Sequence, residues 1–93
     1  MNVAYAHDRV ETQHPEQNIT KDDAVTAWYN AIRSKPRLDK NPDEYLAIGI
    51  DGKGRLMELV AIRDEDGDFL IYHAFIPPQD NAKKELGIYR KGR

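Results

Sequence analysis

The chain has 93 residues, 40% of them hydrophobic and 32% charged, which predicts a single domain over residues 1–93, with a thin core over about 5–87 and a basic tail at 88–93. The absence of cysteine excludes disulfides and thiolate nucleophiles, and the net charge of −2 argues against a dedicated non-specific nucleic-acid binder. No apolar run approaches the length of a membrane span and the N-terminal residues lack the apolar h-region of a signal peptide, so we expect a soluble cytoplasmic protein without membrane contact.

The first half of the chain predicts helices. Residues 5–14 form a short helical pattern that Pro15 ends. Residues 20–33 predict a longer helix, because Thr20 is a good N-cap, acidic residues follow it, and apolar residues around Trp28 recur at helical spacing. Pro36 then stops the helix, and residues 34–43 predict a polar connection.

The second half predicts strands over residues 44–50, 55–63 and 68–75, which are separated by turns at 51–54 and 64–67 that are rich in aspartate and glycine. A short helix is expected over about 81–86, with Asp80 as a candidate cap. The predicted fold class is therefore α+β, with one or two N-terminal helices, a three-stranded antiparallel meander and a short C-terminal helix.

The predicted strand register brings together two side chains that could act in acid–base catalysis. If each turn has four residues, Glu58 lies directly opposite His73, on a face that also carries the small residues Ala47 and Gly49. The other face, which includes Tyr72, is expected to be the core face. A carboxylate beside an imidazole can fix its tautomer and suits acid–base catalysis, although a structural ion pair is an equally simple interpretation.

Several cations are candidate phosphate ligands. Arg55 and Arg63 bracket the second predicted strand, and Arg9 and His7 belong to the first predicted helix. A guanidinium presents a rigid donor fork that matches a phosphate, but arginines beside acidic turns are more often surface residues.

A metal site is the weakest alternative. His7, Glu11 and His14 would share one face of the first helix, but their spacing is looser than that of the zinc-protease signature. The acidic run at 64–68 lacks the later glutamate of a calcium loop and is interpreted as a turn. We therefore expect no metal and no cofactor.

Several short segments resemble a known family. Residues 19–24, 44–49, 54–60 and 71–74 follow one another as in the BrnT group of type II toxins, within the RelE-like ribonuclease superfamily, and residues 7–10 with His14 resemble small bacterial domains without an assigned function. The resemblance implies a compact α/β fold, metal-independent RNA cleavage and neutralisation by a cognate antitoxin. Arg55 matches the arginine after the hairpin glycine, whereas the family's arginine near the position of Phe75 is missing.

The first functional hypothesis is thus a toxin-like ribonuclease. His73, oriented by Glu58, acts as base or acid, and Arg55 or Arg63 stabilises the phosphate, with Arg9 or His7 approaching from the helix.

The second hypothesis is a non-catalytic interaction module, an inactive or repurposed relative, that binds a protein or forms a homodimer. Its contact surface would be an exposed apolar face made by Phe69, Ile71 and Phe75. A metal-dependent hydrolase using His7 and His14 is a third, weaker hypothesis.

Overall fold

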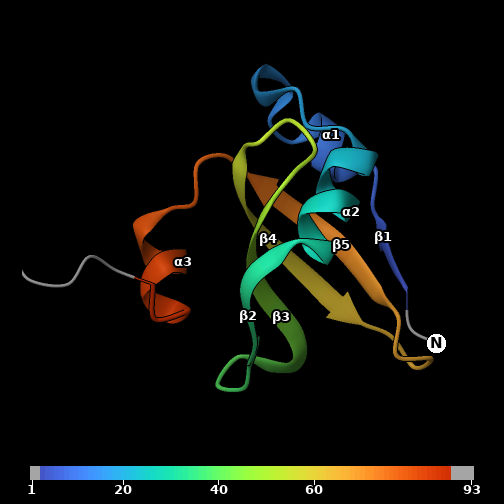
Figure 1. Cartoon of the computed structure of the whole chain (residues 1–93). Helices are drawn as coiled ribbons and strands as arrows, with labels where there is room; N and C mark the ends of the chain where they lie inside the picture. Colours follow the sequence, from blue (N-terminus) through green and yellow to red (C-terminus); the bar gives the residue numbers. More distant parts are fainter. Residues whose placement is uncertain (1–2, 89–93) are drawn as a thin grey trace, which may run out of the picture.

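The computed structural model describes residues 3–88, whose arrangement is shown in Figure 1. In chain order the elements are β1 (Ala4–Ala6), α1 (Arg9–Thr12), the 3-10 turn η1 (Pro15–Gln17), α2 (Lys21–Tyr29), β2 (Ala31–Arg37), β3 (Asn41–Ile50), β4 (Leu56–Arg63), β5 (Phe69–Phe75) and α3 (Asp80–Glu85). Apart from Ile88, the predicted basic tail lies outside the described residues.

The predicted three-stranded antiparallel meander is wrong. The strands form one five-stranded mixed sheet in the order β1-β5-β4-β3-β2. β2, β3, β4 and β5 pair antiparallel in succession, and β1 runs parallel to β5. The three predicted strands are the central ones, β3, β4 and β5. The prediction missed both edge strands, because β1 is very short and β2 is polar, so neither has the apolar alternation that marks a strand.

The first predicted helix is largely a different structure. Residues Ala4–Ala6 pair with β5, and only Arg9–Thr12 are helical. The backbone N–H of His7 donates to the carbonyl of Ile71 at 2.8 Å and extends the parallel ladder. Pairing with β5 therefore overrides the local helical pattern.

The start of α2 is confirmed and its end is not. The Thr20 hydroxyl accepts the N–H of Asp23 at 3.0 Å, and the Asp23 carboxylate accepts the N–H of Thr20 at 2.9 Å. This reciprocal capping box satisfies N–H groups that the first helical turn leaves without partners. The helix ends at Tyr29 rather than at residue 33, because the chain then enters the sheet as β2.

The polar connection predicted over 34–43 is also wrong. Its residues belong to β2, the start of β3 and the tight turn between them, in which the N–H of Lys40 donates to the carbonyl of Arg37 at 2.9 Å. Pro36 lies within β2, opposite Tyr45. An edge strand accommodates a proline because one side of its backbone has no ladder partner to lose.

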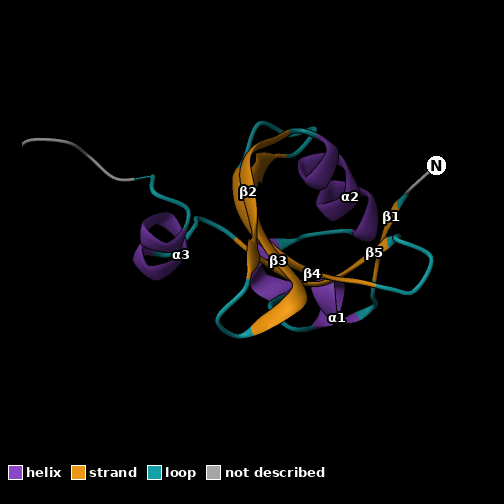
Figure 2. Ribbon diagram, turned by 90° about the horizontal axis from the view of Figure 1, so that it is seen from below, coloured by secondary structure: helices purple, strands orange, loops and turns teal. Residues whose placement is uncertain are grey.

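Helices cover both faces of the sheet (Figure 2). One face packs against α2, and its core, which Val10 of α1 joins, contains Val10, Ile19, Ala24, Ala27, Ala47, Met57, Leu59, Ala61, Ile71 and Ala74. The other packs against α3 in a smaller cluster of Leu46, Ile48, Val60, Ala82 and Leu86. The sequence predicted one core face, whereas both faces of the sheet pack against helices.

The register differs from the predicted one by a single residue between β3 and β4. Ala47 pairs with Leu59, and Ile48 pairs with Glu58. A one-residue slip moves every β3 side chain to the opposite face relative to β4. Ala47 and Gly49 are therefore on the face of α2, and not beside Glu58 as predicted.

Gly49 has a packing role on that face. A Cβ added to it would lie 1.9 Å from the carbonyl oxygen of Ala27, so no side chain fits between β3 and α2. The glycine lets the helix backbone approach the sheet directly.

The apolar surface predicted from Phe69, Ile71 and Phe75 is not exposed. Ile71 is fully buried, and Phe69 and Phe75 are partly buried. The ring of Phe69 packs against those of Trp28 and Tyr45, with centroids 5.1 Å away in each case. An interaction module would need another surface.

The turns and the last helix match their predictions. Gly54 and Gly67 adopt φ angles of 79° and 83° in the two hairpin turns, a conformation that glycine adopts without steric cost. α3 spans Asp80–Glu85, although its N-cap is Gln79 rather than Asp80.

Candidate active site

A cleft of about 330 Å³ lies between α3 and the adjoining face of the sheet. Its lining comes from distant parts of the chain, namely Arg9, Arg37, Leu46, Glu58, Val60, Tyr72, His73, Gln79, Asn81, Ala82 and Glu85. The cleft thus combines α1, four strands and α3, and it holds several of the predicted site residues.

A β-bulge shapes the cleft floor. His73 pairs with Val60, but the next pair joins Ala61 to Ile71, which leaves Tyr72 as an extra residue in β5. An extra residue interrupts the strict alternation of side chains. Both Tyr72 and His73 consequently line the cleft, although neighbours in a regular strand point to opposite faces. The expectation that Tyr72 belongs to the other face is wrong for this reason.

Glu58 and His73 are in contact, as the sequence predicted, but in a different register. Glu58 pairs with Phe75, so His73 is its diagonal rather than its direct neighbour. Nε2 of His73 lies 2.8 Å from Oε2 of Glu58. The register between β4 and β5 thus differs from the predicted one by two residues. Because side chains alternate between the faces, a shift of two residues keeps Glu58 and His73 on the same face.

The Glu58 carboxylate is buried, and both of its oxygens accept hydrogen bonds. Besides His73, it accepts the backbone N–H of Gln79 at 2.7 Å and the side-chain amide of Gln79 at 3.0 Å. Burial alone would raise the pKa of Glu58, but the hydrogen bonds from His73 and Gln79 outweigh it and hold the pKa below its ordinary value of 4.5. Glu58 is therefore ionised at neutral pH and accepts a hydrogen bond from Nε2 of His73.

Arg9 and Tyr72 form a second polar group in the cleft. The guanidinium carbon of Arg9 lies 5.8 Å from the centroid of the Tyr72 ring, within cation–π distance. Burial, together with the carboxylate of Glu44, raises the pKa of Tyr72. The phenol therefore stays protonated at neutral pH and can donate a hydrogen bond.

Arg37 attaches α3 to the sheet. Its guanidinium donates to the Glu85 carboxylate at 2.7 and 2.9 Å and to Glu44 at 2.7 Å. These bonds raise the pKa of Arg37, and the bonds to Glu85 have the largest effect. Sequence reasoning missed Arg37 and Gln79, because each lies in a segment without a regular pattern and acquires partners only through the fold.

Arg55 is not part of this cleft. Its Nε lies 2.7 Å from the Asp51 carboxylate, one terminal nitrogen donates to the carbonyl of Gln17 at 2.7 Å, and the other lies 3.1 Å from the Asp23 carboxylate. These bonds tie the β3–β4 turn to η1 and to the start of α2. Arg55 therefore has a structural role, and its donors are already occupied by these protein acceptors.

Arg63 and His7 also lie away from the cleft lining. Arg63 is at the far end of β4, roughly 16 Å along the strand from Glu58, where it pairs with Asp43 at 3.3 Å and covers the Tyr45 ring at 5.7 Å. Nδ1 of His7 accepts the N–H of Arg9 at 3.0 Å, at the start of α1. Of the predicted phosphate ligands, only Arg9 lines the cleft.

The proposed metal ligands are not brought together. Within residues 3–88, the group of acidic or histidine side chains close enough to share an ion is Asp64, Asp66 and Asp68, in the β4–β5 turn. His7, Glu11 and His14 do not form such a group.

Comparison of the chain with protein-family models, with curated protein sequences and with solved structures found no match. In the part of the chain that the structure describes, no helix is long and apolar enough to cross a bilayer.

Proposed function

We propose that this protein is a toxin-like endoribonuclease that cleaves RNA without a metal ion. The observation that carries the proposal is the hydrogen-bonded pair of His73 and the buried Glu58 in a polar cleft that also holds Arg9 and Tyr72. Metal-independent cleavage needs a base for the 2′-hydroxyl, positive charge for the phosphate and a proton for the leaving oxygen.

His73 is the proposed base. Because ionised Glu58 accepts a hydrogen bond from the N–H at Nε2, the other ring nitrogen of the neutral imidazole, Nδ1, carries a lone pair. Among the described residues Nδ1 has no hydrogen-bond partner, and the imidazole is partly exposed at 23%. It can therefore take the proton of a 2′-hydroxyl while Glu58 stabilises the imidazolium that forms.

The bond changes then balance without a further reagent. The 2′-oxygen attacks the phosphorus, the bond from phosphorus to the 5′-oxygen breaks, and a 2′,3′-cyclic phosphate remains. The imidazolium of His73 returns its proton to the departing 5′-oxygen. Arg9 supplies positive charge to the phosphate, and the neutral Tyr72 hydroxyl supplies a hydrogen bond.

Cleavage of a defined RNA oligonucleotide in the presence of EDTA tests the proposal. His73→Ala is expected to lower the rate by roughly 100-fold or more. Arg9→Ala is expected to lower it by about tenfold or more, the value of a charge-assisted hydrogen bond. Arg63→Ala is the matched control, because Arg63 also covers a tyrosine ring, at 5.7 Å, but lies outside the cleft. Equal rates for Arg9→Ala and Arg63→Ala would remove Arg9 from the site.

The toxin-like function also implies partners and a location. A ribonuclease of this kind acts in the cytoplasm, where a cognate antitoxin neutralises it. Induced expression of the wild type in bacteria is then expected to arrest growth with loss of intact RNA, and His73→Ala is expected to abolish both effects. Normal growth and intact RNA with soluble wild-type protein would contradict a toxin.

One observation favours the alternative of a protein-interaction module. β2 is an edge strand, and the large apolar side chains of Ile32, within it, and Leu38, just after it, are 57% and 72% exposed. An open edge with apolar side chains can add a strand from a partner or a second copy. Sedimentation that shows a stable dimer, together with no cleavage of RNA, would favour this function over the ribonuclease.

A further inference from the structure

The cationic side chains of this acidic protein are not evenly distributed. Most of those described lie within 4.0 Å of a carboxylate, as Lys21 does of Asp8 and Lys53 of Asp23. Within residues 3–88, the cations without a carboxylate at that distance are Arg9, Arg33, Lys35, Lys40 and Lys84. These are the positive charges that the protein leaves free for another molecule.

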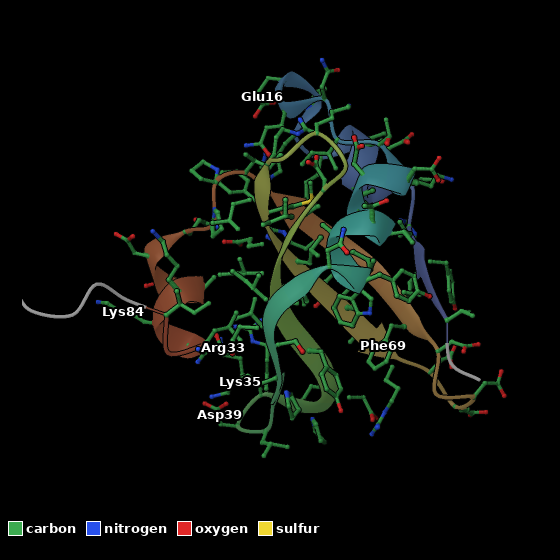
Figure 3. All side chains as sticks on the ribbon, viewed as in Figure 1. Glu16, Arg33, Lys35, Asp39, Phe69 and Lys84 are labelled. Atoms are coloured by element: carbon green, nitrogen blue, oxygen red, sulfur yellow. The ribbon has the colours of Figure 1, made fainter. Side chains whose placement is uncertain are left out.

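Apart from Arg9, which belongs to α1, these cations lie on or next to α3 and β2. Figure 3 shows Arg33 and Lys35 along β2 and Lys84 on α3, on the same side of the molecule. Arg33 reaches α3 directly, since its guanidinium donates to the carbonyl of Leu86 at 3.2 Å. We call Arg33, Lys35, Lys40 and Lys84 the basic strip.

The densest group of acidic side chains lies elsewhere. The β4–β5 turn carries Asp64, Glu65, Asp66 and Asp68, and Figure 1 shows this turn on the side away from α3. Near the basic strip, Glu44 and Glu85 are paired with Arg37, Asp80 with Lys83 and Asp43 with Arg63. Among the described residues there, this leaves Asp39 as the acid without a cation within 4.0 Å. The net charge of −2 thus conceals a local excess of positive charge.

The basic strip is continuous with the candidate active site. A second groove, of about 360 Å³, is lined by Lys35, Pro36, Leu38, Asp39 and Lys40, and it shares Arg37 and Glu85 with the cleft. The Arg37–Glu85 ion pair therefore forms the boundary between the two hollows. A chain bound at His73 that crosses this ion pair meets Lys35 and Lys40 next.

We propose that the basic strip binds the phosphate backbone of single-stranded RNA that extends from the cleft. The proposal rests on the proposed ribonuclease function and adds the path of the substrate. Backbone contacts of this kind carry no base specificity but set affinity, and each one contributes about 0.7 to the slope of log affinity against log salt for a single strand. An acidic protein can bind RNA in this way because the phosphates meet only the local charge.

The binding experiment uses an RNA oligonucleotide with 2′-O-methyl groups, which cannot be cleaved, and measures its affinity by fluorescence anisotropy between 50 and 200 mM salt. The double variant Lys35→Gln, Lys84→Gln removes two cations of the strip. The matched control, Lys21→Gln, Lys53→Gln, changes the net charge equally but removes cations that are paired with carboxylates. Thermal melts verify that both double variants are folded.

The expected result is a loss of affinity of roughly tenfold for the strip variant at 0.1 M salt, with a salt slope lower by about 1.4, and little change for the control. Equal affinities for the two double variants, or no binding by the wild type, would overturn the proposal. Cleavage is read separately with unmodified RNA. Wild-type protein that binds RNA as expected but does not cleave it would refute the ribonuclease function and support RNA binding by the basic strip. Cleavage by the wild type, with equal RNA affinities for the two double variants, would support the ribonuclease function and refute binding by the basic strip.

Discussion

Replacing Glu58 with glutamine tests whether a buried carboxylate organises the cleft. Glu58 is 5% exposed and accepts hydrogen bonds from Nε2 of His73 and from two nitrogens of Gln79. Glutamine has nearly the same shape, but its side chain has one oxygen, and its amide group is a donor. With the tautomer of His73 and the orientation of the Gln79 amide unchanged, at least one of the three donors then faces another donor.

The magnitude follows from those contacts. Hydrogen bonds to a charged group each contribute about 1.5–3 kcal/mol, so losing one predicts that Glu58→Gln lowers the free energy of unfolding by about 1.5–3 kcal/mol at pH 7. For a chain of 93 residues this corresponds to a fall in Tm of roughly 6–24 °C.

The effect must also depend on pH. The folded-state pKa of Glu58 is lowered below 4.5, so its contribution to stability is fully present above that pH and is lost as the pH falls through the lowered pKa. The difference in stability between wild type and Glu58→Gln is therefore expected to shrink from pH 7 to pH 3.

Urea denaturation followed by tryptophan fluorescence, at several pH values, measures this difference, and the exposed residue Glu65, changed to glutamine, is the control. A destabilisation at pH 7 below about 0.5 kcal/mol, the range of ordinary surface changes, would refute the idea that the hydrogen bonds to Glu58 outweigh its burial. So would a difference that does not change with pH.

Further substitutions probe the scaffold around the cleft. Gly49→Ala places a Cβ 1.9 Å from the carbonyl of Ala27 and is expected to destabilise the fold by about 1–3 kcal/mol or more in thermal melts; unchanged stability would mean that α2 does not pack so closely. Arg55→Met is expected to cost about 3 kcal/mol in urea denaturation, because it leaves the buried Asp51 carboxylate without its cation. Cleavage per folded molecule should be retained, and its loss would return Arg55 to the site. Arg37→Met is expected to speed hydrogen exchange in α3, because Glu85 loses its partner, and equal exchange rates would show that apolar packing alone holds the helix.

Local chemistry predicted the features that depend on neighbours in the chain. Thr20 caps α2, Gly54 and Gly67 form the turns, and the three central strands are present because their apolar residues and turn residues are local signals. Even the meeting of Glu58 and His73 was predicted, since a register that shifts by two residues keeps side chains on their face.

The tertiary structure decided what depends on distant partners. The edge strands β1 and β2 exist because the central sheet offers them backbone partners, which their own residues do not indicate. The bulge at Tyr72, which no local pattern in β5 indicates, brings a second functional side chain to the cleft. The fold places the carboxylates of Asp51 and Asp23 beside Arg55, where they occupy its donors. The sequence shows only an arginine next to a turn, and for that reason it suggested a phosphate ligand rather than a structural ion pair.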